Sequence, residues 1–189
     1  PPPRGLQMKY STILADPPWP FETYAGNKVP ARSKKQPYKT MTFEEIANLP
    51  IQNIAAENCA LFCWVTWPTI HHALHTITKW GFQYKTCAFI WVKTTKIDNT
   101  KPAMGLGYWT RSNSEPLLLF TKNKPKRKDT GKSILQPILE PRRLHSRKPN
   151  EARKRIMELV DGPYCELFAR ETFSGWHQAF SNEGTLLDS

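Results

Sequence analysis

The chain alternates between short apolar runs, rich in aromatic and branched side chains, and longer polar stretches. Runs of this length and composition predict strands whose side chains are largely buried. They lie at Thr12–Ala15, Ala60–Val65, Phe82–Val92, Glu115–Thr121 and Tyr164–Ala169. The pattern therefore predicts a sheet built from these segments.

Three segments between these runs predict helices. The first opens with the capping box Thr42-Phe-Glu-Glu45 and ends before Pro50. The second runs from Trp67 to Trp80, and the third from Asn150 to Val160. Strands that alternate with helices favour an α/β domain with a mainly parallel sheet, in which ligands bind at the carboxyl ends of the strands.

Length and composition fit one globular domain. The chain has 189 residues, of which 39% are hydrophobic and 12% aromatic, and this is enough for one substantial core. We predict a single domain over residues 8–183, with terminal tails at 1–7 and 184–189. No apolar stretch approaches the roughly 20 residues that cross a bilayer, so no membrane association is expected.

The cysteines lie in apolar segments and lack the Cys-x-x-Cys spacing of common zinc sites. The weaker alternative is a zinc site, because Cys63 lies within a predicted buried strand; its ligands would come from Cys59, Cys63, His71, His72 and His75. Buried reduced thiols are typical of the cytoplasm. We therefore predict a cytoplasmic protein without a metal site, in which the buried thiols are Cys59, Cys63, Cys87 and Cys165.

Positive charge is concentrated in one part of the chain. The net charge is +11, and the window from Thr121 to Arg155 holds thirteen Lys and Arg residues against three acids. Outside that window the chain is nearly neutral. A basic tract of this kind indicates a polyanionic partner such as nucleic acid. The alternative is a solvated surface segment that only keeps the protein soluble.

The motif Asp16-Pro-Pro-Trp19 directly follows the first predicted strand, and Arg170 directly follows the last. The ends of parallel strands meet at one edge, so Asp16 and Arg170 are predicted to share a pocket. Prolines fix the backbone without adding an N–H donor, so the Asp16 carboxylate and the Pro17 carbonyl can accept hydrogen bonds from a planar amine. Such fixed acceptors favour a pyramidal nitrogen whose lone pair can attack. Trp19 can stack on a base, a contact worth about 1–3 kcal/mol; the alternative is an ordinary Asp-Pro turn with a buried indole.

This motif resembles the signature of methyltransferases that act on the N6 amino group of adenine. The resemblance is to the family of the messenger-RNA N6-adenosine methyltransferase catalytic subunit, and above all to its bacterial and phage DNA-modifying branch. Further segments that resemble the family follow in the same order, from Met8 to Glu183. They are Gln36–Met41, Leu61–Thr66, Ile90–Lys93, Gly107–Trp109 with Asn113 and Glu115, His145–Pro149, Glu166–Arg170, Gly175-Trp176 and Asn182-Glu183.

The resemblance implies a Rossmann-like methyltransferase fold, S-adenosylmethionine as the methyl donor, and a catalytic motif that precedes the cofactor-binding strand. Carried over position by position, it implies that the catalytic residues are Asp16, Pro17, Pro18 and Trp19. The implied cofactor contacts are Asp16, Lys148, Arg170, Asn182 and Glu183. Substrate contacts are expected at Tyr38, Trp109 and Asn113, and phosphate contacts in the basic tract at Lys124, Lys126, Arg127, Lys128 and Arg143.

We therefore expect an adenine N6-specific methyltransferase that acts on nucleic acid. DNA is favoured over RNA, and the protein is expected to act as a monomer or homo-oligomer without an obligate partner. Two long polar segments, 24–39 and 93–113, are expected to close over an adenine turned out of the duplex. Two alternatives stay open: the same chemistry on RNA adenosine, or a non-catalytic subunit that only holds nucleic acid.

Overall fold

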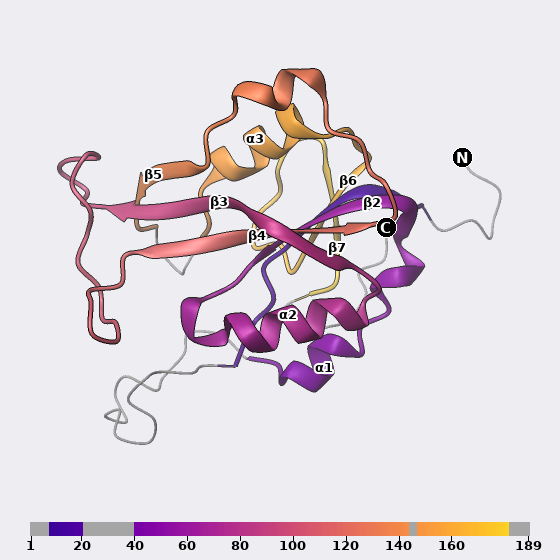
Figure 1. Cartoon of the computed structure of the whole chain (residues 1–189), viewed down its shortest axis with the longest axis horizontal. Helices are drawn as coiled ribbons and strands as arrows, with labels where there is room; N and C mark the ends of the chain where they lie inside the picture. The colour runs from indigo at the N-terminus through magenta and orange to yellow at the C-terminus, as the bar shows by residue number, and fades with distance from the viewer. Residues whose placement is uncertain (1–7, 21–39, 144–146, 182–189) are drawn as a thin grey trace.

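The computed structural model describes residues 8–20, 40–143 and 147–181. These residues contain one sheet of seven strands in the order β5-β3-β4-β2-β1-β6-β7 (Figure 1). Neighbouring strands pair in parallel, except that β4 runs antiparallel to both β2 and β3. This confirms the predicted α/β class with a mainly parallel sheet. The strands are β1 (Tyr10–Ala15), β2 (Ala55–Trp64), β3 (Gln83–Thr94), β4 (Ser114–Lys122), β5 (Pro137–Pro141), β6 (Tyr164–Leu167) and β7 (Trp176–Ala179).

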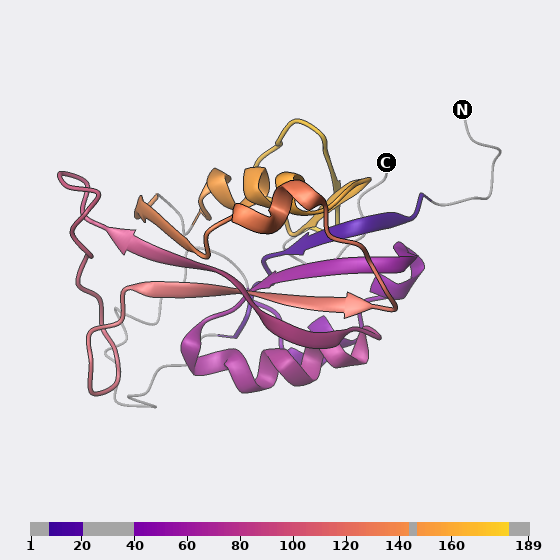
Figure 2. The same ribbon diagram turned by 45° about the horizontal axis from the view of Figure 1, so that its top comes forward.

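Helices cover both faces of the sheet (Figure 2). The helices α1 (Phe43–Ala47) and α2 (Ile70–Lys79) pack on one face, and α3 (Asn150–Leu159) packs on the other. The structure is therefore a three-layer sandwich. Short 3-10 turns complete the connections at Ile51–Asn53, Trp67–Thr69 and Asp129–Ser133.

Strand β1 supplies side chains to both layers of the core. Ile13 and Ala15 join the apolar cluster under α1 and α2, whereas Leu14 between them joins the cluster under α3, as the two-residue period of a strand requires. None of the three is more than 2% exposed. Strand β1 lies inside the sheet, between β2 and β6. Asp16, the residue that follows it, therefore lies at the end of an inner strand.

The five apolar runs all form strands, and the predicted capping box is present. Thr42 Oγ1 accepts the Glu45 N–H at 3.1 Å, and Glu45 Oε2 accepts the Thr42 N–H at 2.7 Å. Strands β5 and β7 were not predicted. Both are short strands at the outer sides of the sheet. Neither shows an apolar run, because β5 begins and ends with a proline and β7 has His177 and Gln178 at its centre.

The cysteines follow the predicted pattern of burial with one exception. Cys59, Cys63 and Cys165 are buried, whereas Cys87 is half-buried, and all four are free thiols. Burial raises the pKa of Cys59 and of Cys165 to about 12, which keeps these thiols protonated and unreactive. In the described part of the chain, no helix is both long and apolar enough to cross a bilayer.

One edge of the sheet collects the carboxyl ends of every strand except β4. Because β4 is reversed, its first residues, Ser114 and Glu115, lie at this same edge, opposite Val92 and Trp91 of β3. We call it the carboxyl edge and the opposite one the amino edge. Ligands of α/β proteins bind at the carboxyl edge, and the candidate site lies there.

Candidate active site

Asp16 lies at the carboxyl edge, one residue beyond the end of β1. Its N–H donates to the Leu167 carbonyl of the neighbouring β6 at 3.4 Å, so the backbone is still tied to the sheet at this point. Pro17 and Pro18 follow and are buried, and neither supplies an N–H donor. The Pro17 carbonyl accepts the Trp19 N–H at 2.8 Å, and a carbonyl oxygen has a second lone pair for a further donor.

Trp19 closes this turn by packing into the core. Its side chain is 8% exposed, and its ring centroid lies 5.9 Å from that of Phe43 in α1. The indole Nε1–H donates to the Trp64 carbonyl at the end of β2 at 2.8 Å. These contacts hold the turn between β1, β2 and α1. Little of the Trp19 ring is exposed in the structure, and its stacking on a base stays a prediction.

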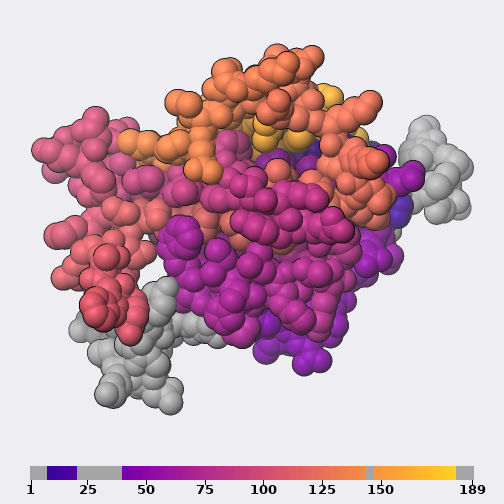
Figure 3. All heavy atoms as spheres, viewed as in Figure 1, coloured from indigo at the N-terminus to yellow at the C-terminus, as the bar shows by residue number. Residues whose placement is uncertain are grey.

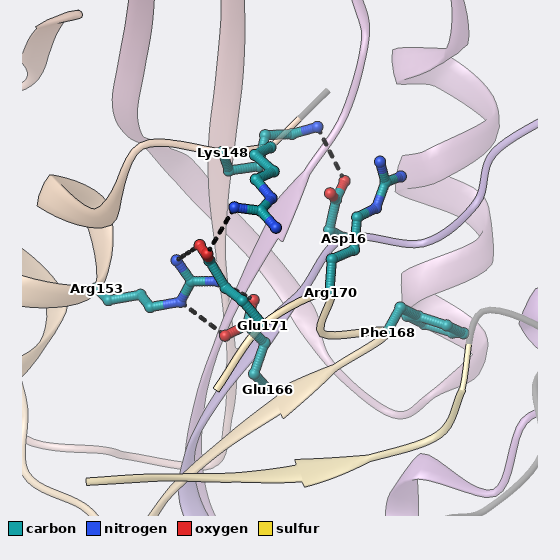
Figure 4. A pocket seen from close by; sticks show the side chains of 8 residues that line it. Asp16, Lys148, Arg153, Glu166, Phe168, Arg170 and Glu171 are labelled. Atoms are coloured by element: carbon teal, nitrogen blue, oxygen red, sulfur yellow. Dashed lines mark hydrogen bonds and ion pairs between the residues drawn. The ribbon is translucent and has the colours of Figure 1, made fainter. Parts of the chain in front are cut away.

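Lys148 joins Asp16 to a second carboxylate at the carboxyl edge. Its Nζ lies 3.1 Å from Asp16 Oδ1, as Figure 4 shows, and 3.3 Å from Glu115 Oε2. Glu115 in turn accepts a hydrogen bond from Lys93 Nζ. The four side chains alternate in charge and come from four different segments of the chain. They are between 14% and 18% exposed, so water screens these charges only in part.

The pKa values of Lys148 and Glu115 follow from this arrangement. Burial lowers the pKa of the Lys148 ammonium, but Asp16 and Glu115 more than offset the effect, and the pKa lies above its usual value. Burial raises the pKa of Glu115, yet the ammonium groups of Lys148 and Lys93 bring it below its usual value. Lys148 and Glu115 are therefore both charged at neutral pH.

Asp16 lines a pocket whose walls carry both signs of charge (Figure 4). Arg147, Lys148 and Arg170 supply cations, and Glu171 supplies a further carboxylate. The pocket is partly open to solvent. Asp16, Lys148 and Arg170, which come from distant parts of the sequence, thus line one pocket.

The end of β6 shows how Arg170 reaches this pocket. Phe168, directly after the strand, has a positive φ of 61°, which is uncommon for a residue other than glycine and costs of order 1–3 kcal/mol. Its fully buried ring holds this conformation, and its N–H donates to the Phe180 carbonyl at 3.0 Å. The chain therefore leaves the sheet at Phe168, and Arg170 lines the pocket.

A buried ion pair forms another part of the pocket wall. Arg153 of α3 donates through Nε and Nη2 to the two carboxylate oxygens of Glu166 in β6, at 2.7 and 2.6 Å. The two side chains are 5% and 7% exposed. Burial raises the pKa of Glu166, and the Arg153 guanidinium opposes that rise. Arg153 Nη1 also lies 3.6 Å from Glu171, whose other oxygen lies 3.4 Å from Arg147. This ion pair holds α3 against β6, and α3 begins two residues after Lys148.

The structure brings some of the other predicted site residues to the carboxyl edge and separates the rest. Trp109 and Asn113 lie in the loop between β3 and β4, and Arg143 lies just beyond β5, all at the carboxyl edge. The amino edge, where β4 ends beside the start of β2, holds the predicted phosphate contacts Lys124, Lys126, Arg127 and Lys128. Three predicted contacts lie outside the described residues: Tyr38, Asn182 and Glu183.

The sequence alone assigned no role to Lys93 and Glu115, or to the ion pair of Arg153 and Glu166. A signal for the first pair exists, because both stand at ends of predicted strands that are neighbours in sequence. Glu166 also carries a signal, since a lone carboxylate inside an apolar strand requires a buried partner. The identity of that partner, in a helix, depends on the tertiary structure.

A mostly parallel sheet with helices on both faces and a charged pocket at its carboxyl edge is the arrangement of a Rossmann-like methyltransferase. The chain belongs to the MT-A70 family, whose model matches residues 10–180. This is a family of adenine N6-methyltransferases, and its members generally use S-adenosylmethionine. The resemblance expected from the motifs is thereby confirmed.

Three relatives show how far the similarity extends. The chain is 31% identical over 192 residues to the Type II methyltransferase M.MunI of Mycoplasma sp, an alignment that covers 92% of this chain and 78% of that protein. It is 29% identical over 187 residues to the N(6)-adenine-specific methyltransferase METTL4 of Homo sapiens, covering 91% of this chain and 37% of that protein. It is 39% identical over 104 residues to the N6-adenosine-methyltransferase non-catalytic subunit MTB of Arabidopsis thaliana, covering 54% and 12%.

The charges of the pocket fit S-adenosylmethionine, which carries a carboxylate, an ammonium and a sulfonium group. Arg147, Lys148 and Arg170 can pair with the carboxylate, since guanidinium and ammonium groups are its usual partners. Asp16 and Glu171 can accept from the ammonium and compensate the sulfonium charge. A pocket lined by a single sign of charge would suit only one end of this molecule.

Proposed function

We propose that this chain transfers a methyl group from S-adenosylmethionine to the N6 amino group of adenine in DNA. The observation that carries the proposal is the position of Asp16, held between β1 and two prolines, 3.1 Å from Lys148 and in one pocket with Arg170. Family membership supports the adenine chemistry. The similarity to the Type II methyltransferase M.MunI along 92% of this chain, and the motifs of the bacterial and phage branch, favour DNA.

Asp16 and the Pro17 carbonyl would accept the two hydrogens of the adenine N6 amine. The lone pair of that nitrogen is delocalised into the ring, and two acceptors held in place favour the pyramidal form whose lone pair is available. The backbone contacts of Asp16 and the buried prolines provide this fixed geometry. Holding the amine next to the methyl donor also removes much of the entropic cost of their encounter.

S-adenosylmethionine would supply the methyl group in this pocket. Arg147, Lys148 and Arg170 would bind its carboxylate, and Glu115 with Lys93 would hold Lys148 in position. Asn182 and Glu183 stay predicted contacts to its ribose or adenine. This assignment gives Lys148 two tasks, because the same ammonium also compensates the charge of Asp16.

The variant Asp16→Asn tests the proposal, since it keeps the shape of the side chain and removes its charge. We expect methyl transfer from tritium-labelled S-adenosylmethionine to an adenine-containing oligonucleotide to fall by about 100-fold or more. Circular dichroism and a thermal melt should show an intact fold. Glu44→Gln, which changes an exposed carboxylate of α1, is the matched control. Full turnover by Asp16→Asn would contradict the mechanism.

The same assay separates the possible substrates. Single- and double-stranded DNA and RNA of one sequence should be compared, and we expect the fastest transfer to DNA. Faster methylation of RNA would assign the chain to RNA and leave the N6 chemistry in place.

A non-catalytic role is the second candidate, because one relative is named a non-catalytic subunit. Calorimetry with S-adenosylmethionine separates the two, since a protein that only holds nucleic acid should show no saturable heat. We expect saturable binding, weakened in Lys148→Met.

A further inference from the structure

Large apolar side chains stand exposed in the loop between β3 and β4, residues 95–113, which we call the β3–β4 loop. The exposed fractions are 100% for Ile97, 80% for Met104, 90% for Leu106, 62% for Tyr108 and 93% for Trp109. The space-filling view shows this part of the chain standing out from the body of the molecule (Figure 3). Exposed large apolar side chains that gather in one loop are typical of a surface that contacts another molecule.

The outer part of this loop is a built structure. A Cβ on Gly105 would lie 2.1 Å from the Ser112 carbonyl oxygen, and a Cβ on Gly107 would lie 2.3 Å from the Thr110 carbonyl oxygen. The two arms of the loop therefore pack backbone against backbone, which only glycine permits. This packing presents Tyr108 and Trp109 at the turn between the arms.

Trp109 has an unusual backbone for such a large side chain. Its φ is 67°, in the left-handed region that is rare for bulky residues. Its ring makes an edge contact with Tyr108, at 6.4 Å between centroids, and is otherwise almost entirely in solvent. Strained conformations that burial does not compensate are found where function requires them.

The surroundings of the loop are basic. Lys96 and Arg111 are exposed within it, and the Arg142 guanidinium lies 2.9 Å from where a Cβ of Gly105 would be. Arg143 follows directly and is also exposed. Cations around an aromatic tip suit a polyanion that carries flat rings, which describes nucleic acid. A second copy of this chain suits them less well, because two copies of this basic surface would repel each other.

The root of the loop is connected to the candidate active site. Lys93 lies at the end of β3 and Glu115 at the start of β4, and these two residues form the network that reaches Asp16 through Lys148. An aromatic tip and the catalytic carboxylate are thus carried on one edge of the sheet. A nucleic acid bound at Asp16 would extend along this edge.

We infer that Tyr108 and Trp109 stack on the nucleobases next to the target adenine. The inference rests on the proposed function, in which one adenine leaves the stack to reach Asp16. Removal of that base leaves its neighbours with exposed ring faces, and an aromatic side chain covers such a face at little conformational cost. Stacking of this kind tolerates any sequence, since every base has a flat face.

The test compares Trp109→Ala with a matched control on two oligonucleotides. One carries a single adenine between normal bases, and the other carries the same adenine between two abasic residues. We expect Trp109→Ala to weaken binding about tenfold on the first, as measured by fluorescence anisotropy, and hardly at all on the second. The control is Tyr84→Ala, which removes a half-exposed aromatic at the amino edge and should match the wild type on both.

Tryptophan fluorescence gives a second readout on the wild type. Trp109 is 93% exposed and Trp67 39%, whereas the other described tryptophans are at most 8% exposed. Quenching by acrylamide should therefore report mainly on Trp109, and the first oligonucleotide should protect it. Trp109→Phe should remove most of the protected signal and keep the affinity.

The outcomes are distinguishable from those of the proposed function. Equal loss of affinity on both oligonucleotides, or no loss, would overturn the stacking inference even if the wild type transfers methyl groups. A wild type that binds in this base-dependent way without methyl transfer would overturn the proposed function alone. If sedimentation shows a dimer that Trp109→Ala dissociates, the tip contacts a second copy and the inference is wrong.

Discussion

Glu115 is the residue that connects the parts of the candidate site. Its carboxylate pairs with Lys148 on one side and with Lys93 on the other, so it links the root of the β3–β4 loop to Asp16. Without it, Lys93 and Lys148 would each lose a carboxylate partner. In the proposed function, Glu115 would act on the chemistry through Lys148, as a positioning residue.

The pKa of Glu115 leads to a pH-dependent prediction. Because the folded state holds this pKa below the usual 4.5, ionised Glu115 stabilises the fold above about pH 4.5, and the stabilisation is lost as the pH falls through the folded pKa. Glu115→Gln should be less stable than the wild type at pH 7 in urea unfolding. The difference should shrink steadily as the pH is lowered below about 4.5.

The control for this prediction is Glu57→Gln, which changes an exposed carboxylate on β2 and should show no such trend. If Glu115→Gln differed from the wild type by the same amount at every pH, the carboxylate would contribute through its shape alone, and its charge would not matter.

Among the elements, α3 has the largest part in supporting the site. Lys148 precedes its first residue by two positions, and Arg153 on its buried face binds Glu166 of β6. The sheet thus holds α3 through a charged pair in addition to the apolar contacts of Ala152 and Ile156. Such a pair has directional bonds, so it sets the position of the helix more narrowly than apolar packing does.

Removal of one partner should be costly for that reason. Arg153→Met leaves the Glu166 carboxylate buried without its counter-charge, and we expect the free energy of unfolding to fall by about 3–5 kcal/mol. Replacement of both, in Arg153→Met with Glu166→Leu, should recover part of the loss, because no buried charge is then left alone. Urea unfolding measures both variants, with the exposed Lys154→Met as control. A double variant less stable than the single one would contradict this account.

At the scale of the whole molecule, the basic tract is split between two opposite edges of the sheet. The part that follows β4 lies at the amino edge, and the part that follows β5 lies at the carboxyl edge with Asp16. A phosphate backbone bound near Asp16 meets the second part first. Both edges have a cation that is compensated within the protein: Lys128 pairs with Asp161 at 3.0 Å at the amino edge, and Arg143 pairs with Glu140 at 2.9 Å at the carboxyl edge.

Two sets of charge-removing substitutions test which edge binds DNA. The carboxyl-edge set replaces Lys96, Arg111, Arg142 and Arg143 by glutamine, and the amino-edge set replaces Lys124, Lys126, Arg127 and Lys128. Each lost phosphate contact should lower the slope of log affinity against log salt by about 0.7–0.9. We expect the carboxyl-edge set to weaken binding and flatten this slope more than the amino-edge set, with cofactor affinity unchanged in both. The reverse result would show that the amino edge makes most of the phosphate contacts and would contradict this expectation.

The sequence by itself determined most of the helices and strands and the family of this protein. Apolar runs at β1, β2, β3, β4 and β6 and the capping box of α1 are local patterns, and their energetics depend on near neighbours, so they can be read without a structure. The motif at Asp16 is also a local pattern, because each of its two prolines restricts the dihedral angles of its own backbone. What only the tertiary structure decided was the set of partners. Contacts between residues far apart in the chain reverse β4 and so bring Glu115 to Lys148. Such contacts also form the outer strands β5 and β7 and place the basic tract at two opposite edges of the sheet. No local pattern specifies these contacts.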